Sequence, residues 1–290
     1  MNGILVIDKP EGLTSFDVVA KVRRTLKVKK CGHTGTLDPM ATGVLPIMLG
    51  SATKLAPFLV DSRKEYTATM LLGRSTDTLD ITGRVTEERD ISQLQITAAD
   101  IEQAMAGFRG GILQEPPMYS ALKKDGKRLY DLARQGIEVE REKRPVTVYE
   151  LKLLSIDFPY ITFHAAVSKG TYIRSLIRDL GEALGVPATM AELRRTLTGG
   201  FTLAETVTLD DLDSVGILDK IIQVESTLME YPELLLEESF IRLLKNGVRL
   251  KDGRATGDLA EGIYRIKNRD LGFIGLADFR EGELSLIWRL

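Results

Sequence analysis

The amino-acid sequence predicts an α+β protein, in which helices flank a mixed, largely antiparallel β-sheet and a small β-barrel follows at the C-terminal end. Strand-like and helix-like patterns alternate through most of the chain, as they do when a sheet and its helices share one core. Residues 146–156 and 161–167 are alternating and β-branched, so we expect them to pair around Pro159. Beyond Tyr231, glycines separate short apolar runs, which is typical of a small barrel.

The size of the chain fits two domains. Its 290 residues are 43% hydrophobic and 28% charged, the balance of a folded globular protein with a sizeable core. At ~150 residues per domain, this length corresponds to roughly two domains. We place a large domain at residues 1–230 and a small one at residues 232–290, because the composition changes at Tyr231 and Pro232.

The composition also predicts a location and argues against a metal. No apolar run approaches the ~18 residues of a membrane span, and no basic region precedes the apolar start of the chain. We therefore expect a cytoplasmic protein with no signal peptide and no membrane partner. A single cysteine, Cys31, permits no disulfide within the chain, and His33 and His164 are the only histidines. A cysteine- or histidine-based metal site is not expected.

Hydrophobic spacing predicts the N-terminal elements. Residues 3–7 form an apolar strand that ends before Pro10. Ser15 is a candidate N-cap for an amphipathic helix over residues 15–27, where apolar side chains recur at helical spacing. Residues 64–73 have the pattern of a strand.

Three more helices are predicted further along the chain. Thr97 is expected to cap a helix that runs to about Phe108, and residues 126–135 form a helix that ends at a glycine. Thr171 is the candidate cap of a helix that continues to about Leu184.

Charge is segregated along the chain, although the net charge is only 39 − 41 = −2. Residues 21–30 hold six basic side chains and no acid, whereas residues 205–238 hold ten acids and Lys220 as the only base. Such segregation could turn one face toward phosphate and another toward water, and solvated helix faces are the alternative. Further basic clusters comprise Lys123, Lys124, Lys127 and Arg128; Arg141, Lys143 and Arg144; and Arg242, Lys245, Arg249, Lys251 and Arg254.

The segment 31–43 is the candidate site. It contains three glycines and a proline without a sustained period, which predicts a long structured loop of the kind that usually carries function. Asp38 is its only acid, and Pro39 biases Asp38 away from helical backbone angles. An Asx-turn, in which Asp38 would bond to its own loop, is the alternative. A P-loop, a Gly-x-Ser-x-Gly elbow and a dinucleotide fingerprint are all absent.

The residues of this loop resemble those of a known family. The run Gly32-His33-Thr34-Gly35-Thr36-Leu37-Asp38-Pro39, continued by residues 41–46, resembles the catalytic loop of the TruB family of tRNA pseudouridine synthases. The C-terminal residues 246–247 and 273–275 are similar to a PUA RNA-binding domain, which would make the expected barrel PUA-like. Five other segments resemble family motifs in family order: residues 5–10, 64–66, 116–123, 168–176 and 193–195.

The details of the resemblance favour one branch of the family. Guided H/ACA-type relatives have longer chains and need partner proteins, and this chain lacks their extensions. Synthases of large-subunit ribosomal RNA carry an arginine where this chain has Thr36. The resemblance therefore implies a stand-alone bacterial type, with no obligatory protein partner and no need for a dimer, so we expect a monomer.

The reaction implied by the resemblance is the isomerisation of uridine to pseudouridine at position 55 in the T-loop of tRNA. The C1′–N1 bond breaks, the uracil turns, and C5 bonds to C1′, without a cofactor. The target base must leave its stack, at a cost of a few kcal/mol. Asp38 aligns with the catalytic aspartate and could act as a nucleophile or as a base; the sequence leaves both open.

The resemblance also implies roles for other residues. Arg174 would pair with Asp38 and favour its ionised form, and the alternative is a surface arginine paired with Asp179 or Glu182. Tyr66 and Tyr172 would flank the uracil, Tyr66 with a possible part in proton transfer; half-buried packing is their alternative role.

Three further site residues are implied in the same way. His33 would fill the space that the flipped base leaves, or be a hydrogen-bonded loop histidine. Leu193 would close the pocket, although a leucine there could be core. Lys9 would touch the RNA backbone, while residues 21–30 and an insertion near residues 115–146 would grip the T-arm stem-loop by shape and phosphate.

Two other classes of protein remain open at this point. One is a tRNA-binding or tRNA-folding chaperone whose modification activity is secondary or absent. The other is a hydrolase that uses Asp38 with Tyr66 on a ligand other than RNA, against which the basic clusters weigh. RNA that co-purifies with the protein would separate the second from the rest.

Overall fold

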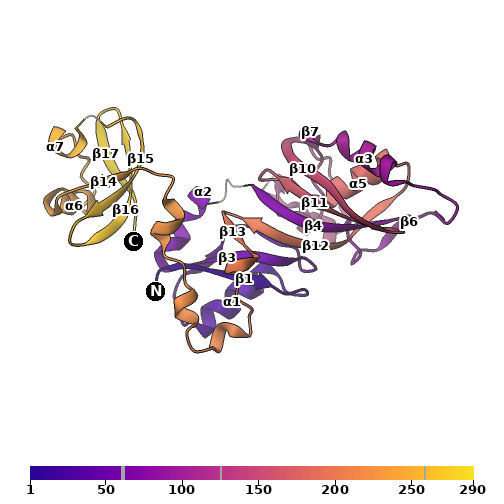
Figure 1. Ribbon diagram of the computed structural model, residues 1–290, viewed down its shortest axis with the longest axis horizontal. Coiled ribbons are helices and arrows are strands. Elements are labelled where there is room, and N and C mark those ends of the chain that lie inside the picture. Colours follow the sequence, from indigo (N-terminus) through magenta and orange to yellow (C-terminus); the bar gives the residue numbers. More distant parts are fainter. Residues whose placement is uncertain (60–62, 125, 258) are drawn as a thin grey trace.

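The computed structural model describes residues 1–59, 63–124, 126–257 and 259–290. The molecule is elongated, with a large sheet and its helices in the middle and at one end, and a C-terminal module at the other end (Figure 1). Across the described ranges, no helix has both the length and the apolar character that a membrane crossing requires.

The large sheet has nine strands and is mixed, as the sequence predicts. Its main path is β1-β3-β12-β4-β11-β10-β7, with β2 paired to β3 and β13 paired to β12. Every pair in it is antiparallel except β12 with β3. The strands are β1 Gly3–Lys9, β2 Cys31–His33, β3 Thr42–Leu49, β4 Lys64–Leu72, β7 Gly110–Gln114, β10 Arg144–Asp157, β11 Tyr160–Val167, β12 Ala188–Thr198 and β13 Phe201–Thr202.

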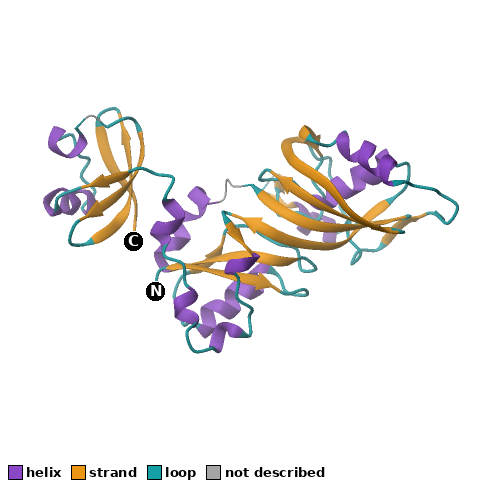
Figure 2. Ribbon diagram, in the orientation of Figure 1, coloured by secondary structure: helices purple, strands orange, loops and turns teal. Residues whose placement is uncertain are grey.

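Helices cover the core-forming face of this sheet (Figure 2). Helix α5 packs on β12, α3 on β10 and α1 on β2, and their apolar faces share one buried cluster with the strands. The helices here are α1 Ser15–Thr25, α2 Ala56–Leu59, α3 Ala98–Ala106, α4 Leu129–Arg134 and α5 Ile173–Ala183; the 3-10 helix η1 spans Gly50–Leu55. Two hairpins lie outside the sheet: β5 Arg74–Thr76 with β6 Val85–Glu88, and β8 Lys123–Lys124 with β9 Lys127–Arg128.

Three predicted helix starts are wrong by a few residues. The cap of α1 is Thr14, whose hydroxyl accepts from the Asp17 amide while Asp17 accepts in return, so Ser15 is already helical. Before α4, Lys127 and Arg128 form β9, which pairs with β8, so the helix begins at Leu129 and is shorter than expected. Helix α5 begins after Tyr172, which offers no side-chain cap, and the hydroxyl of Thr171 binds the Ser168 carbonyl instead.

The C-terminal module is an open sheet and not the closed barrel that the sequence predicts. Its strands follow the path β14-β15-β16-β17, and no pairing in the described residues joins β17 back to β14. The apolar side of α6 fills one face, through Phe240, Ile241 and Leu244, so the core is closed by a helix. The elements are β14 Glu233–Leu235, α6 Glu238–Lys245, α7 Gly253–Thr256, β15 Gly262–Asn268, β16 Gly272–Arg280 and β17 Glu283–Arg289.

The chain reaches this module through a run of short 3-10 helices, and the module then packs back onto the large domain. The helices are η2 Leu203–Glu205, η3 Asp211–Asp213, η4 Ile217–Lys220 and η5 Val224–Leu228. Leu276 and Trp288 of the module share an apolar cluster with residues of β1, β3 and η1. The Trp288 indole N–H also donates to the Ser51 carbonyl at 3.0 Å. The two parts therefore share a buried seam.

Replacing Trp288 with alanine should open this seam. The ring is 4% exposed and stacks on Phe273, so its loss leaves a cavity and an unpaired Ser51 carbonyl. We expect the free energy of unfolding to fall by about 3 kcal/mol. Urea unfolding followed by circular dichroism measures it, with Leu271→Ala, at 53% exposure, as the surface control. Equal midpoints for the two variants would show that the seam contributes little.

Candidate active site

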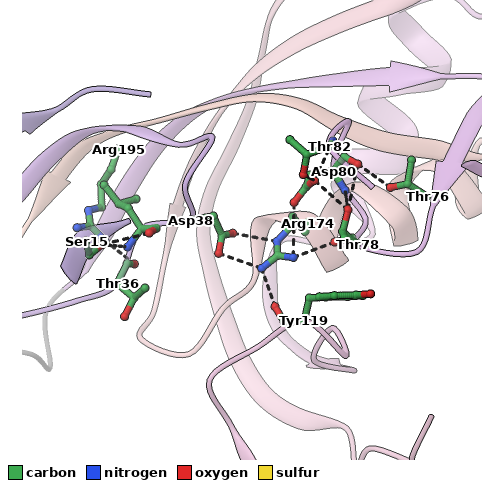
Figure 3. Close-up of polar contacts among 11 residues, drawn as sticks. Ser15, Thr36, Asp38, Thr76, Thr78, Asp80, Thr82, Tyr119, Arg174 and Arg195 are labelled. Atoms are coloured by element: carbon green, nitrogen blue, oxygen red, sulfur yellow. Dashed lines mark hydrogen bonds and ion pairs between the residues drawn. The ribbon is translucent and has the colours of Figure 1, made fainter. Parts of the chain in front are cut away.

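Asp38 lies in the loop between β2 and β3 and binds a distant side chain. Its Oδ2 is 2.9 Å from Nε of Arg174, and its Oδ1 accepts a hydrogen bond from Nη2 at 3.1 Å (Figure 3). Both carboxylate oxygens thus meet the guanidinium fork, an arrangement that fixes orientation as well as distance. The Asx-turn alternative does not account for this carboxylate, and the expected pairing with Arg174 is present.

The Arg174 guanidinium also donates hydrogen bonds to two backbone carbonyls. Arg174 is in the first turn of α5 and only 5% exposed. Its Nη1 donates to the Thr78 carbonyl at 2.8 Å, and its Nη2 donates to the Tyr119 carbonyl at 2.9 Å. The alternative partners suggested by the sequence, Asp179 and Glu182, are contacted instead by Arg178. Arg174 is therefore a buried clamp and not a surface charge.

A second carboxylate, that of Asp80, is buried on the other side of Arg174, and the sequence alone did not point to it. Asp80 is 5% exposed, and its Oδ2 is 3.7 Å from Arg174 Nη1. Its Oδ1 accepts from the hydroxyl of Thr78 and from both the amide and the hydroxyl of Thr82. The threonines on either side of Asp80 could have indicated a hydrogen-bonded carboxylate. They do not single out Asp80, because Asp77 also has threonine neighbours and lies in a turn near the surface.

The electrostatic balance at Asp38 is set mainly by burial. Desolvation raises the pKa of Asp38 above its ordinary value, Arg174 acts in the opposite direction, and the charge of Asp80 raises it again. Arg174 therefore favours the ionised form, as expected, but does not outweigh the desolvation. A carboxylate in this state is a stronger base than one in water.

Lys9 is not where the sequence analysis placed it. Its side chain is fully buried, and Nζ donates to three carbonyls: Pro10 at 2.8 Å, Pro39 at 3.1 Å and Ala41 at 2.6 Å. An ammonium enclosed in this way cannot reach an RNA backbone, so the expected contact is wrong. Burial lowers the pKa of Lys9 to about 8. Its observed role is to hold the part of the loop that directly follows Asp38, through the Pro39 and Ala41 carbonyls.

The tyrosines and Leu193 lie on the elements around this loop. Tyr66, 7% exposed, is on β4, and Leu193, 8% exposed, is on β12 opposite Ala68; both belong to the main core cluster. Tyr172 precedes α5, where its amide and carbonyl bind the side chain of Gln114. Burial raises the pKa of Tyr172, which also feels the charges of Arg174 and Asp38.

His33 ends β2 at the start of the loop that carries Asp38. Its Nδ1 is buried without a hydrogen-bond partner among the described residues, as is the hydroxyl of the adjacent Thr34. Burial, and then the charge of Arg195, lower the pKa of His33, so its imidazole is neutral at neutral pH. A hydrogen-bonded loop histidine, the alternative in the sequence analysis, is not what these atoms form.

Arg174, Asp80 and Lys9 come from segments far apart in the sequence, and all three act electrostatically on the Asp38 carboxylate. In the part of the chain that the structure describes, no three His, Cys, Asp or Glu side chains are grouped to hold a metal ion. An oriented, desolvated carboxylate beside a buried arginine is suited to act as a nucleophile or as a base. The fold and this group together define an enzyme.

Comparison with known proteins identifies the family. Residues 23–173 match the model described as "TruB family pseudouridylate synthase (N terminal domain)", and residues 174–231 match "tRNA pseudouridylate synthase B C-terminal domain". A tRNA pseudouridine synthase B of Clostridium kluyveri is 46% identical over 99% of each chain. One of Clostridium tetani is 48% identical over 95% of each. The chain therefore belongs to the TruB family of pseudouridylate synthases, and it is an isomerase.

Solved structures agree with this assignment. A chain of an H/ACA RNP bound to a substrate RNA containing 2'-deoxyuridine has a TM-score of 0.72 and 28% identity, covering 99% of this chain and 84% of that one. A chain from a Cbf5-Nop10-Gar1 complex has a TM-score of 0.73 and 29% identity at the same coverage.

Proposed function

We propose that this enzyme converts the uridine at position 55 in the T-loop of tRNA to pseudouridine. The observation that carries the proposal is the Asp38 carboxylate held by both arms of the buried Arg174 guanidinium. Relatives that match the chain over almost its full length are named tRNA pseudouridine synthase B, which supports tRNA as the substrate. A bacterial enzyme acting on tRNA works in the cytoplasm, which is the location that we propose.

The proposed chemistry centres on Asp38. The flipped uridine enters beside Asp38, which attacks as a nucleophile or removes a sugar proton as a base, and the C1′–N1 bond breaks. The uracil turns while the site excludes water, and C5 bonds to C1′ as the bond to Asp38 breaks or the sugar takes its proton back; C5 then loses its proton and N1 gains one. Arg174 orients Asp38 and favours its ionised form before the reaction begins. No cofactor takes part.

The other site residues would contact the uracil and fill the space that it leaves in the RNA. We assign Tyr66 and Tyr172 to the two sides of the uracil, with Tyr66 as a candidate for proton transfer, and Leu193 to the closure of the pocket. The unpartnered Nδ1 of His33 supports its proposed role, because an imidazole with a free nitrogen can enter the space that the flipped base leaves and bond to RNA there.

The proposed division of labour between domains follows the charge distribution. Residues 1–230 form the catalytic domain, its insertion near residues 115–146 grips the T-arm, and residues 232–290 form a PUA-like RNA-binding domain. A cleft between the two domains has a volume of about 560 Å³ and supports this assignment, because several of its lining residues are basic. These are Lys27, Lys29, Lys30, Lys54 and Arg289. The enzyme is expected to bind as a monomer and without a protein partner.

The proposal is tested by tritium release from a tRNA transcript that carries label at C5 of its uridines. C5 loses its hydrogen only when it becomes the new glycosidic carbon, so release reports isomerisation. We expect release from the wild-type transcript and none from one with cytidine at position 55. Tight binding without release from either would favour the chaperone alternative, and equal release from both would place the target elsewhere.

Removing charge from the insertion should weaken tRNA binding and flatten its salt dependence. Lys123, Lys124 and Arg128 are exposed on the β8–β9 hairpin. Replacing two of them with glutamine should lower the slope of log affinity against log salt by roughly 1 to 2. Filter binding at several salt concentrations measures this slope. The double variant Arg84→Gln with Lys220→Gln is the control, and an unchanged slope in the insertion variant would place the grip elsewhere.

The pH profile should show the raised pKa of Asp38. Because the ionised form acts, kcat/KM is expected to fall as the pH drops through that pKa, which lies above the ordinary 3.8. Asp80 contributes to the rise, so Asp80→Asn should move this acid limb to lower pH. Steady-state rates between pH 4 and 8 measure both. An acid limb that does not respond to Asp80→Asn would mean that another group titrates.

A further inference from the structure

A second buried arginine, Arg195, lies under the catalytic loop and holds its backbone. The side chain is 0% exposed. Its Nε donates to the Val44 carbonyl at 2.8 Å, its Nη2 to Gly35 at 3.0 Å and its Nη1 to Thr36 at 3.4 Å. These carbonyls lie on both sides of Asp38 in the chain, so one planar guanidinium fixes both limbs of the loop. Figure 3 shows Arg195 beside Thr36.

The same residue connects the loop to Tyr66. In β12, Arg195 is in register with Gly43 of β3 on one side and with Tyr66 of β4 on the other. The phenol of Tyr66 and the Arg195 guanidinium interact electrostatically, which acts to raise the pKa of Arg195 against the effect of burial. Gly43 adopts a φ of 101°, and a Cβ there would lie 2.2 Å from the Arg195 carbonyl oxygen. A side chain at position 43 would therefore clash with the backbone of Arg195.

Burying the Arg195 guanidinium in this way lowers the stability of the folded protein. The groups that meet the guanidinium within the described ranges are three carbonyls and a phenol, none of which carries a full negative charge. Burial lowers the pKa of Arg195, and its charge also lowers the pKa of Lys9 and of His33. An apolar side chain of similar length would fill the space without the desolvation penalty. We therefore look for a role of Arg195 in the function of the site, and not in the packing of the core.

We propose that Arg195 is a positioning residue that sets the catalytic loop and Tyr66 relative to each other, so that Asp38 and the phenol meet the same uracil. The proposal rests on the function proposed above, because it assumes that both groups act on one base. Arg195 itself touches no reacting atom. Lys9 and Ser15 hold other parts of the loop, Ser15 through the Leu37 backbone at 2.8 and 3.1 Å, but neither reaches Tyr66 in the contacts that the structure describes.

The first test is Arg195→Lys, which keeps the charge and loses the fork. We expect kcat to fall by about 10- to 100-fold, since a misplacement of ~1 Å can cost that much, while KM stays within about threefold. Arg109→Lys is the matched control: Arg109 also donates to a backbone carbonyl, that of Leu151, at 2.6 and 3.0 Å, and its kcat should not change. A normal kcat for Arg195→Lys, or a loss in KM alone, would overturn the proposal.

A double-mutant cycle separates positioning from general support of the fold. If Arg195 acts through Tyr66, the variant Arg195→Lys with Tyr66→Phe should lose little more activity than the worse single variant. Fully multiplicative losses would refute the coupling.

Hydrogen exchange gives a readout that does not depend on activity, and it distinguishes this proposal from the proposed function. Arg195→Lys should speed amide exchange in residues 35–44 and leave β16 unchanged. Faster exchange throughout the protein would indicate a merely structural role and overturn the proposal. A wild-type enzyme that releases no tritium would count against the proposed function, and the loop exchange would still decide whether Arg195 positions the loop.

Discussion

Replacing Asp38 with asparagine is expected to reduce isomerisation by at least about 10⁴-fold, the scale of loss seen when a central catalytic carboxylate is neutralised. Asparagine matches the shape of aspartate and can still accept one hydrogen bond from Arg174, so the loop should keep its place. It is neither an effective nucleophile nor a base. Tritium release under single-turnover conditions measures the loss, and filter binding should give a tRNA affinity within about threefold of the wild type.

The matched control is Asp77→Asn. Asp77 lies three residues before Asp80, on the β5–β6 hairpin, where its Oδ1 accepts from the Arg84 amide and its Oδ2 is 3.8 Å from Arg84 Nε, so its carboxylate meets Arg84 and not Arg174. This variant should keep its rate. Residual activity of Asp38→Asn within tenfold of the wild type would show that Asp38 is not the reacting group, whereas a parallel loss of tRNA binding would point to a role in recognition.

Replacing Arg174 with lysine is expected to lower kcat by roughly 10²- to 10³-fold, comparable to the removal of one oriented donor from an active site. The guanidinium serves both oxygens of Asp38 together with the Thr78 and Tyr119 carbonyls. An ammonium is a point charge with three donors and cannot reproduce that fork. Asp38 would then lose its fixed orientation while its charge remains partly compensated.

Arg178→Lys, one turn further along α5, is the control for this variant. Arg178 pairs with Asp179 at 2.7 Å, and its side chain is 23% exposed, so its replacement should change kcat less than about threefold. Single-turnover rates for both variants, with melting temperatures to compare stability, make the test. If Arg174→Lys melts at a much lower temperature and keeps its rate, the arginine supports the fold and not the chemistry.

Most helices and strands of the large domain could be predicted from the sequence, because the patterns that indicate them lie within short segments of the chain. The alternation in residues 161–167 and the Thr97 capping box both appear where expected. The helix starts at Thr14 and Tyr172 were missed by one or two residues, because several adjacent residues are acceptable caps. The closed barrel was wrong for another reason: glycine spacing indicates turns, but it does not show which edge strands meet.

The candidate site was only partly accessible from the sequence. Asp38 and Arg174 were identified because they stand in motifs that resemble the family. The positions of Asp80 and Arg195 in the site depend on burial and on the register of paired strands. Neither can be predicted locally, because the paired segments are far apart in the sequence. Lys9 was misplaced because a lysine is most often exposed, and nothing local shows that three carbonyls enclose this one.

The parallel pairing of β12 with β3 has a consequence for how the active site is made. It rests on two residue pairs, and among the residues that the structure describes it is the only strand pairing between the β1–β3 portion and the portion from β12 to β7. The Arg195 to Val44 hydrogen bond spans 151 residues, so each portion can form by shorter-range pairing before this long closure is made. Catalytic competence should therefore be the last property that the folding or newly synthesised chain acquires. Chains cut short before α5 would hold Asp38 without Arg174 of α5 and without Arg195 of β12, which binds the backbone of its loop, and would remain inert toward RNA.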